Sequence, residues 1–598
     1  MRFISPIKDY AIIGNGRTAA LVDRRGSIDW CCWPQFDSSA VFCRLLDADR
    51  GGFFQIVPVQ AFQVTRSYMD DTNILTTTFS TASGQVRVHD FMPAPEDENG
   101  QSIPHRILRW IEGIRGSVEV KLQFCPTFDF ARAKATLACH SSGATAISED
   151  EALSLVCSIP LQRQDDSLVG RATIVAGENL WIALTHCPPV EAPSHLEFSP
   201  LEAQAEYERT LEYWRQWIGK CNYEGPDQRL VRRSLLALKL LFFQPSGGLV
   251  AAPTTSLPED IGGIRNWDYR YTWLRDSGLV LDVLQQLGYH EESLRFIEWL
   301  EKLNSDGQAD LKIMYTVDGT KVPPEQELDH LNGYQNSRPV RVGNAAADQI
   351  QLDVFGHVID AVVLCIERMP RPVRSELWEL LSAWAEQAAM NWRQPDRGPW
   401  EMRGEPQHFV YSKLYCWLAL DRALRLAETH ELSGPLDRWQ TERDAIRKEI
   451  LKRGFNEELQ SFTQILDGTK LDASVLTLPL NEFLPASDAR MQSTIARLQE
   501  NLMTNGLMCR YRHDDLPGRE GTFVLCSFWL VSNLALAGRV EDARSLFNHI
   551  CGFANDVGLF AEEIDPDTRE LLGNFPQGFA HLGLIRAALH LADAEQWN

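Results

Sequence analysis

The stretch LEAQAEYERTLEYWRQWIGK, from Leu201 to Lys220, decides the fold, because the spacing of apolar residues changes here. Within it, apolar side chains recur every three to four residues, which is the period of an amphipathic helix. The run RLVRRSLLALKLLFF, which begins at Arg229, continues the same period. The stretch therefore predicts the start of a helical region that differs from everything before it.

The sequence before this stretch alternates between apolar and polar residues, as strands with one buried face do. Ser83 and Gly84 lie between two alternating runs and predict a hairpin turn. Because no helical pattern intervenes, we expect an antiparallel β-sandwich over residues 1–200. The clearest runs are GFFQIVPV from Gly52, AFQVTRSYM from Ala61, NILTTTFSTASGQVRVHDF from Asn73 and VEVKLQFCP from Val118.

After the stretch, amphipathic patterns follow one another, separated by loops rich in Gly, Pro and Asp. We expect a helical linker over residues 201–228 and an all-α toroid of paired helices, of the (α/α)6 kind, over residues 229–598. No internal repeat is strong enough to prove that the toroid closes. The predicted helices cover residues 273–288, 291–304, 346–368, 374–393, 409–429, 435–453, 488–502, 523–537, 540–553 and 577–594.

Composition narrows the function classes. The 598 residues carry a formal net charge of -23, which argues against a nucleic-acid partner. No apolar run reaches the roughly 20 residues of a membrane helix, and the start, MRFISPIKDYAIIGNG, lacks a signal-peptide core. The 13 cysteines show no CxxC spacing and lie mostly in apolar runs, as reduced core thiols do. We therefore expect a cytoplasmic protein without a membrane partner; self-association into a homo-oligomer stays open.

The segment NWDYRYTWLRDSGLV, residues 266–280, combines aromatic rings with an Arg-Asp pair. Rings such as those of Tyr269 and Trp273 cover the apolar faces of a pyranose. Arg275 and Asp276 provide charged hydrogen-bonding groups for its hydroxyls. The segment therefore predicts a sugar site.

Two later carboxyls complete a hydrolytic hypothesis. Glu401 follows Trp400 in GPWEMRG, and Glu562 lies in GLFAEEIDP. A neighbouring tryptophan excludes water and raises a carboxyl pKa, as a general acid requires, and paired carboxyls are the groups of glycoside hydrolysis. The alternatives are a helix cap or surface ion pair for Glu401 and solvated surface charge for Glu562. Two further candidates, His408 as a substrate contact and Glu520 in LPGREGTF, have equally ordinary readings as a structural histidine and a helix-start or ion-pair carboxyl.

Other common motifs do not fit. GNGRTA from Gly14 resembles a dinucleotide fingerprint, but the following ALVDRRGSIDW reads as strand, turn and strand, with no room for the required helix. A glycine-containing β-turn explains it better. The chain has no GxxxxGK[ST], HExxH or GxSxG, and its histidine spacing suggests no metal site. We expect neither a cofactor nor a metal.

At these residues the chain resembles glycoside hydrolase family 15, the glucoamylases and bacterial-type trehalases. The resemblance rests on DYRYTWLRDSGLVLDVL, GPWEMRGEPQHFVYSKLYCWLALDRA, LPGREGTFVLCSFWLV and GLFAEEIDPDTRELLGNFPQGFAHLGLIRAA, in family order. The N-terminal IKDYAIIGNGRTAALVDRRGSIDWCCWPQFDSSAVFCRLLD resembles the trehalase-like domain that precedes the catalytic domain in many bacterial members. The resemblance to the family as a whole implies a β-sandwich followed by an (α/α)6 catalytic toroid.

The resemblance also implies roles. Glu401 matches the general acid and Glu562 the general base of an inverting hydrolase that releases β-glucose from an α-glucoside. Arg275 and Asp276 match the pair that holds the terminal glucose, with Tyr269, Trp273 and Trp400 beside them, and Gln351 and Asp353 in QIQLDVFG match another site-lining segment.

The sequence leaves two substrates open, trehalose and α-glucans, because both present the same terminal glucose to the site. The N-terminal domain and the lack of an export signal or starch-binding module favour α,α-trehalose over α-1,4 or α-1,6 glucooligosaccharides. A non-catalytic carbohydrate-binding protein is disfavoured because both carboxyls and the Arg-Asp pair are present. An inverting phosphorylase is disfavoured because its base position would be vacant.

Overall fold

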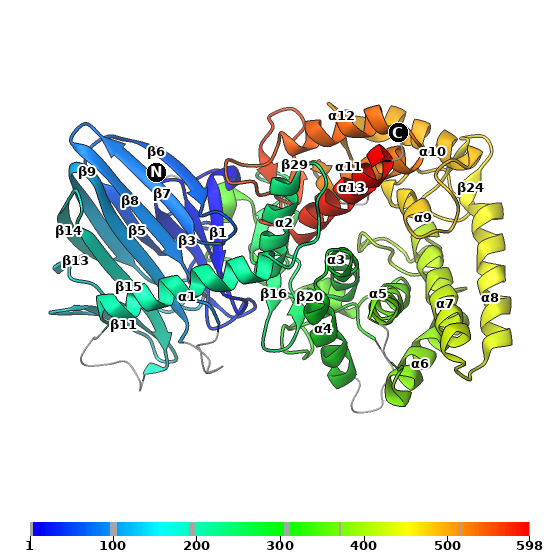
Figure 1. Ribbon diagram of the computed structural model, residues 1–598, viewed down its shortest axis with the longest axis horizontal. Helices are drawn as coiled ribbons and strands as arrows, with labels where there is room; N and C mark the ends of the chain where they lie inside the picture. Colours follow the sequence, from blue (N-terminus) through cyan, green and yellow to red (C-terminus); the bar gives the residue numbers. More distant parts are fainter. Residues whose placement is uncertain are drawn as a thin grey trace.

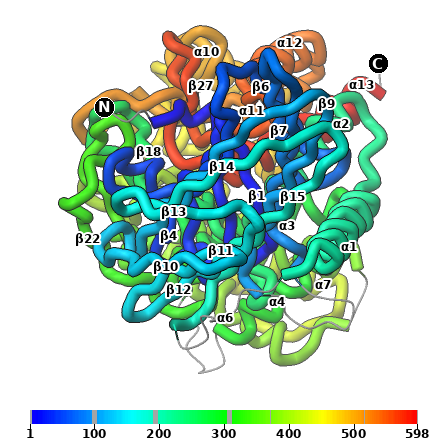
Figure 2. Tube along the Cα trace, turned by 90° about the vertical axis from the view of Figure 1, so that its left-hand side faces the viewer, coloured from blue at the N-terminus to red at the C-terminus, as the bar shows by residue number. Residues whose placement is uncertain are grey.

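The computed structural model describes residues 4–95, 104–189, 198–303, 311–369, 372–512, 514 and 516–596. Strands fill one end of the molecule and helices the other (Figure 1). Figure 2 views the molecule from the sheet end, with the strands in front of the helical part. The predicted order, antiparallel strands first and helices after, is confirmed.

Among the described residues before α1, fifteen strands join in one antiparallel sheet, with the order β1-β2-β3-β5-β9-β15-β12-β11-β10 along its main path. The strands are β1 (Tyr10–Gly14), β2 (Ala19–Asp23), β3 (Ser27–Cys32), β4 (Ala40–Phe42), β5 (Phe53–Pro58), β6 (Phe62–Tyr68), β7 (Leu75–Thr81), β8 (Gly84–Phe91), β9 (Arg106–Cys125), β10 (Thr136–His140), β11 (Gly143–Ile147), β12 (Ala152–Val156), β13 (Leu161–Gln164), β14 (Ser167–Val175) and β15 (Asn179–Cys187).

Strand β9 connects two groups of strands in this sheet. Its first half pairs with β8 and β15, and its second half pairs with β5 and β14. Where the partners change, Gly116 has a φ of +64° and a Cβ there would lie 2.2 Å from the Ser83 carbonyl oxygen. A glycine is therefore required at this point.

Two turns predicted from the sequence are confirmed. Ala82 and Ser83 connect β7 to β8, with Ser80 opposite Gln85. The GNGRTA segment is a tight turn between β1 and β2, in which the Asn15 side chain accepts hydrogen bonds from the backbone of Arg17 and Thr18 at 3.1 and 3.3 Å. No helix follows the glycines there, since the described residues go directly into β2.

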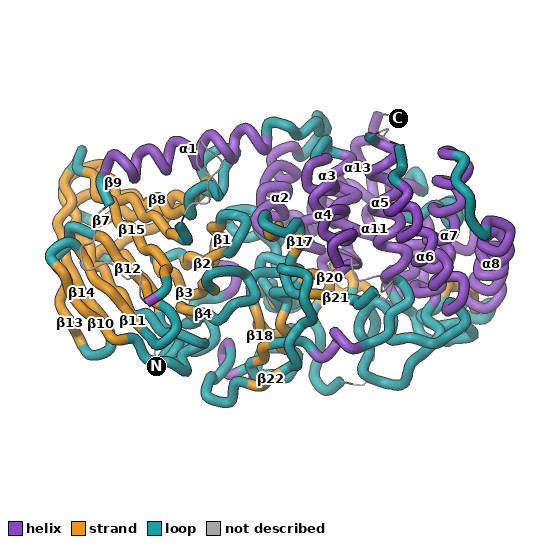
Figure 3. Tube along the Cα trace, turned by 90° about the horizontal axis from the view of Figure 1, so that it is seen from below, coloured by secondary structure: helices purple, strands orange, loops and turns teal. Residues whose placement is uncertain are grey.

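Helix α1 (Pro200–Ile218) begins with a capping box, in which the Ser199 hydroxyl accepts from Glu202 N–H and the Glu202 carboxylate accepts from Ser199 N–H. The helix runs along the sheet (Figure 3). Its Tyr207 ring packs against Trp110 of β9, with ring centroids 5.2 Å apart. The segment predicted as a linker therefore packs lengthwise on the sheet.

The remaining helices coincide with the predicted ones, including α2 in the helical run from Arg229, and only the short α9 was not predicted. The largest difference lies in residues 346–368, where α5 begins only at Val354, because Ala345–Asp348 form a 3-10 turn capped by Asn344. The helices are α2 (Gln228–Leu241), α3 (Leu274–Gln286), α4 (His290–Leu303), α5 (Val354–Arg368), α6 (Ser375–Asn391), α7 (Val410–His430), α8 (Leu436–Glu449), α9 (Thr477–Leu480), α10 (Ala489–Leu502), α11 (Val524–Leu536), α12 (Val540–Cys551) and α13 (Gly578–Gln596).

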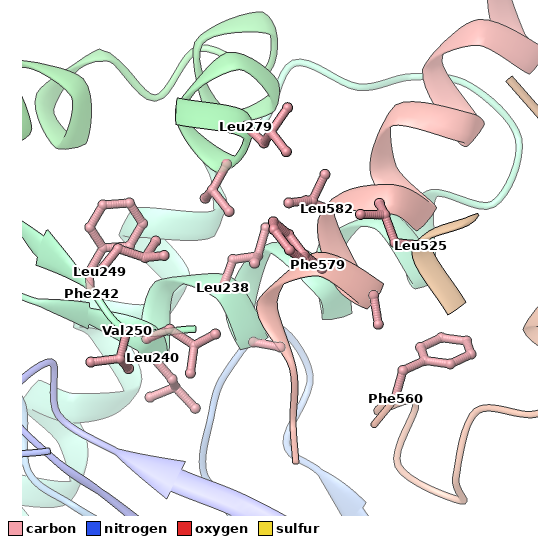
Figure 4. Close-up of a cluster of buried hydrophobic side chains, with 14 of the residues drawn as sticks. Leu238, Leu240, Phe242, Leu249, Val250, Leu279, Leu525, Phe560, Phe579 and Leu582 are labelled. Carbon is pink, nitrogen blue, oxygen red and sulfur yellow. The ribbon is translucent and has the colours of Figure 1, made fainter. Parts of the chain in front are cut away.

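Helices α3, α5 and α7 contact one another in order, α9, α11 and α13 do the same, and α13 contacts α3. A 3-10 turn (Ala473–Leu476) connects α7 with α9. Leu238 of α2, Leu279 of α3, Leu525 of α11 and Leu582 of α13 meet in one buried cluster (Figure 4). The helical part thus shares one buried core, to which helices from both ends of the segment contribute.

Short strands occupy the loops between the helices, and those that matter for the site are β18 (Thr255–Pro258), β19 (Asn266–Asp268), β20 (Thr272–Trp273), β21 (Met314–Tyr315), β28 (Thr522–Phe523), β29 (Glu563–Ile564) and β30 (Leu571–Leu572). The other short strands are β16 (Phe242–Phe243), β17 (Gly248–Leu249), β22 (Gln326–Glu327), β23 (Arg341–Val342), β24 (Phe455–Asn456), β25 (Ser461–Phe462), β26 (Met503–Thr504) and β27 (Leu507–Met508). None of the helices in the described ranges is long and apolar enough to span a bilayer.

Candidate active site

A cavity of about 260 Å³ lies where the loops lead into helices α3, α7, α11 and α13. Its wall combines aromatic rings, carboxyls and guanidinium groups from segments far apart in the sequence. Of the candidate residues named from the sequence, the following line it: Tyr269, Trp273, Arg275, Asp276, Trp400, Glu401, Glu520 and Glu562. The structure therefore brings the two candidate carboxyls and the aromatic segment into one enclosed space.

One short segment holds both carboxyls. The Tyr269 hydroxyl donates to Glu562 Oε1 at 2.7 Å, and Trp273 Nε1 donates to Glu401 Oε1 at 2.8 Å. The two rings lie close together, with centroids 5.6 Å apart. Strand pairing on either side, β19 with β18 and β20 with β21, fixes this segment in place. The spacing of the carboxyls is therefore set by two residues four positions apart.

Glu401 occupies a strained backbone position, with a φ of +56°. Its Oε1 also accepts a hydrogen bond from Arg275 Nη2 at 3.1 Å, and its carbonyl accepts one from Gln349 Nε2 at 3.2 Å. The side chain keeps 23% of its exposure. Both side-chain donors therefore reach the same oxygen, Oε1.

The Trp400 ring forms the wall beside Glu401. It packs against Phe523, with centroids 5.5 Å apart, and its Nε1 donates to the buried Asp472 carboxylate at 3.0 Å. A hydrogen bond at one edge and a ring contact on one face hold the indole in a single orientation. The ring therefore presents a fixed apolar surface to the cavity.

Glu562 directly precedes strand β29, which pairs with β28 and β30. Its backbone N–H donates to the Asn574 carbonyl at 3.3 Å. Burial raises the pKa of Glu562 to about 7, although the Arg510 guanidinium and the Tyr269 hydroxyl act in the opposite direction. Among the described residues, its second oxygen has no hydrogen-bond partner. The carboxyl is thus poised to exchange a proton near neutral pH.

Gly573 leaves room for this carboxyl. A Cβ there would lie 2.5 Å from Glu562 Oε2, and the residue has a φ of +74°. We expect Gly573→Ala to lower kcat/KM by about 10-fold or more, because displacing a reacting group by a fraction of an ångström is costly. Gly538→Ala is the matched control, since Gly538 has a φ of +76° and nothing within 4 Å of its Cβ position. Steady-state kinetics of both variants check this, and equal losses would contradict it.

Arg275 and Asp276 lie in the first turn of α3. Arg275 Nη1 donates to Gln351 at 2.8 Å and to Asp353 at 3.0 Å, so both predicted residues hold the guanidinium from behind. Burial alone would raise the pKa of Asp353, yet Arg275 and His357 lower it to about 2. Burial raises the pKa of Asp276 to about 8, partly offset by Arg275. Asp276 thus presents a carboxyl to the cavity.

Three sequence-predicted residues do not line the cavity. Gln351 and Asp353 act on it through Arg275, and Gln351 also donates to the lining residue Gln349 at 3.1 Å. His408 lies outside the lining, and its carbonyl accepts a hydrogen bond from Leu466 N–H at 2.9 Å, so its predicted contact with substrate is not supported. The loop leads the chain to the start of α7 instead of turning this side chain inward.

Other lining residues were missed from the sequence. Arg510 Nη2 lies 2.7 Å from Glu520 Oε1 and 3.3 Å from Glu259 Oε2, which confirms the ion-pair reading of Glu520. Burial raises the pKa of Glu259 to about 8, against the effect of Arg510. Trp267 lies between the guanidinium groups of Arg341 and Arg403, 4.7 and 4.3 Å from its ring centroid. Trp267 was visible within the aromatic segment, whereas nothing local marked Arg510 or Glu259.

Comparison with known proteins agrees with this geometry. The family model described as "Glycosyl hydrolases family 15" matches residues 225–589, which contain every cavity-lining residue. The chain belongs to glycoside hydrolase family 15. A second model, "Trehalase-like, N-terminal", matches residues 3–176. The protein is therefore a glycosidase, and the family match covers its helical part.

Relatives cover almost the whole chain. A protein named trehalase from Thermoplasma volcanium is 36% identical and covers 98% of this chain and 94% of its own length. Another trehalase, from Mycolicibacterium smegmatis, is 38% identical and covers 99% of this chain and 92% of its own length. A solved structure of a bacterial glucoamylase complexed with acarbose shares the fold, with a TM-score of 0.73 at 14% identity over 98% of this chain and 94% of its own.

Proposed function

We propose that this glycosidase hydrolyses α,α-trehalose with inversion of configuration, Glu401 acting as general acid and Glu562 as general base. The observation that supports this most strongly is the pair of carboxyls in one cavity, each held by a different ring of the Tyr269–Trp273 segment. Inversion requires carboxyls about 6.5–9.5 Å apart, so that a water fits between the base and the sugar.

In the proposed reaction, protonated Glu401 donates to the glycosidic oxygen as the bond to C1 breaks. Ionised Glu562 removes a proton from a water that attacks C1 from the opposite face, which yields β-glucose. The proton that Glu562 gains and the one that Glu401 loses are exchanged with solvent before the next turnover. Tyr269 stabilises the ionised form of Glu562 by donating to it.

Arg275 and Asp276 supply orientation in this mechanism. Arg275 is held by Gln351, Asp353 and Glu401, so its position does not depend on the substrate. Asp276, next to it, is available to accept hydrogen bonds from sugar hydroxyls. Such prearranged groups lower the entropic cost of aligning the reacting bond with the two carboxyls.

The raised pKa of Glu562 predicts the pH dependence of the free enzyme. The base works only when it is ionised, and burial raises its pKa to about 7. We therefore expect kcat/KM to fall as the pH decreases through about 7, tenfold for each further pH unit. A pH profile of kcat/KM on trehalose checks this. A profile that stays flat down to pH 5 would contradict the role of Glu562.

The choice of trehalose is supported by the relatives named trehalase, which match this chain at 36–38% identity over nearly its full length, and by the trehalase-like N-terminal match. Glucose release from trehalose, maltose, isomaltose and maltoheptaose, measured side by side, tests it. We expect the highest kcat/KM on trehalose. A preference for maltoheptaose would instead make the enzyme a glucoamylase.

We further propose the finer architecture that the contacts support. The sequence of helix–helix contacts, from α3 through α13 and back to α3, favours a closed (α/α)6 toroid. Strand β9 pairs with β15 in its first half and with β5 in its second half, which favours a sheet folded over into a β-sandwich.

The cytoplasm is the proposed compartment, because buried thiols such as Cys416 and Cys526 are typical of reduced proteins. Light scattering of the purified protein distinguishes a monomer from a homo-oligomer.

A further inference from the structure

The sheet domain reaches the segment that carries Tyr269. In Figure 3 the short strand β18 lies near the boundary between the sheet and the helices, and β20 lies below α3 and α4. Arg270, the residue after Tyr269, points away from the cavity and is 1% exposed. Its Nη1 donates to the Ser38 carbonyl at 2.6 Å and approaches the Phe36 carbonyl at 3.4 Å. Both carbonyls belong to the loop that connects β3 with β4.

The rest of the Arg270 guanidinium stays within its own segment. Nε and Nη2 donate to the two carboxylate oxygens of Asp268, at 2.8 and 2.7 Å. The Phe130 ring of the sheet domain lies 5.2 Å from the guanidinium carbon. The planar group therefore connects the two domains by hydrogen bonds that leave it little freedom.

A second contact reaches the same segment from the other side. Trp30 Nε1, on strand β3, donates to the Pro253 carbonyl at 2.8 Å. The next residue, Thr254, accepts a hydrogen bond from Tyr269 N–H at 3.4 Å. The Thr254 hydroxyl also donates to the side-chain oxygen of Asn574. The backbone carbonyl of Asn574 in turn accepts from Glu562 N–H. Through Pro253 the sheet domain thus contacts a segment that is hydrogen-bonded to Tyr269 and, by way of Asn574, to Glu562.

We propose that the sheet domain is a positioning element for the catalytic base: through Arg270 and Trp30 it fixes the segment that presents the Tyr269 hydroxyl to Glu562. This inference rests on the proposed role of Glu562. Neither Arg270 nor Trp30 touches the substrate cavity, so both act through Tyr269. The Tyr269–Glu562 hydrogen bond is 2.7 Å long, and a small displacement of the segment would weaken it.

The test compares the acidic limb of the kcat/KM profile in four variants. Tyr269→Phe removes the hydrogen bond itself. We expect it to move the acidic limb upward by about one pH unit, and the shifts of the other variants are compared with this one. Arg270→Lys keeps a positive charge beside Asp268 but loses the Nη1 group that reaches the loop carbonyls. Trp30→Phe keeps the ring and loses the donor. The double variant Tyr269→Phe/Arg270→Lys reports whether the two changes act through one interaction.

Asn73→Ala is the matched control. Asn73 Nδ2 donates to the Leu236 carbonyl at 3.0 Å, which makes a buried hydrogen bond between the same two domains. The acceptor, Leu236, lies on α2 and not on the Tyr269 segment. We expect this variant to lower Tm and to leave the acidic limb in place. It separates a general loss of domain contact from the effect on Glu562.

We expect Arg270→Lys and Trp30→Phe to shift the limb upward by part of the Tyr269→Phe shift, and Arg270→Lys to add nothing when Tyr269 is already Phe. A lower Tm with an unmoved limb in both single variants would overturn the proposal, and so would full additivity in the double variant. If Tyr269→Phe itself leaves the limb unmoved, the assignment of Glu562 as base fails and the proposal fails with it. Trp30→Phe decides alone if Arg270→Lys does not fold.

Discussion

Glutamine in place of Glu401 is expected to lower kcat on trehalose by about 10²- to 10⁴-fold, the usual contribution of a general acid. The amide has the size of the carboxyl, and it can still accept from Trp273 and Arg275, which both reach Oε1 in the native site. The fold should therefore survive and Tm should change little. What the variant loses is the proton for the glycosidic oxygen.

The leaving group provides the control for this variant. α-Glucosyl fluoride presents the same terminal glucose, but fluoride departs without a proton. We therefore expect Glu401→Gln to retain most of its activity on the fluoride while it loses activity on trehalose. Equal losses on the two substrates would mean that Glu401 positions the sugar and does not protonate it. Full activity on trehalose would remove Glu401 from the mechanism.

Glutamine in place of Glu562 is expected to lower kcat by about 10²- to 10⁴-fold on both substrates, because the attacking water needs a base whichever group departs. The acidic limb near pH 7 should also be absent from any residual activity, since the group whose pKa burial raises to about 7 is gone. Parallel kinetics of trehalose and α-glucosyl fluoride hydrolysis test this. Retained fluoride hydrolysis would assign the base to another carboxyl.

Glu563 supplies the matched control for Glu562. It is the next carboxyl in the chain, fully buried, and it accepts from Gly521 N–H at 2.9 Å. Burial, reinforced by Glu259, raises the pKa of Glu563 well above the ordinary value, which favours its neutral form. An amide resembles a neutral carboxyl in size and charge. We therefore expect Glu563→Gln to retain far more activity than Glu562→Gln.

Local patterns in the sequence were sufficient for the elements and for the aromatic segment. Alternation predicted the strands around Ser83, and the three-to-four-residue period predicted the helices, because a single face of each element is buried. The start of α5 was predicted too early, since the Ala345–Asp348 turn has the composition of a helix but is held by the Asn344 cap. Composition within a segment does not report such a cap.

Contacts between distant segments could not be predicted in the same way. Arg510 faces Glu259 and Glu520, 251 and 10 residues away, and nothing beside Arg510 in the sequence indicates an inward position. The carboxyls Glu401 and Glu562 were found because each follows a distinctive apolar lead and matches a family motif. Their shared dependence on Tyr269 and Trp273 became visible only once the chain was folded.

The anomers first formed from trehalose test the inverting mechanism most directly. Attack on C1 from the face opposite the leaving group converts one α-linked glucose to the β anomer, while the departing glucose keeps its α configuration. Proton NMR in the first minutes, before mutarotation, should therefore show α- and β-glucose in equal amounts. Only α-glucose at early times would mean retention, and would contradict the assignment of Glu562 as the base that activates water.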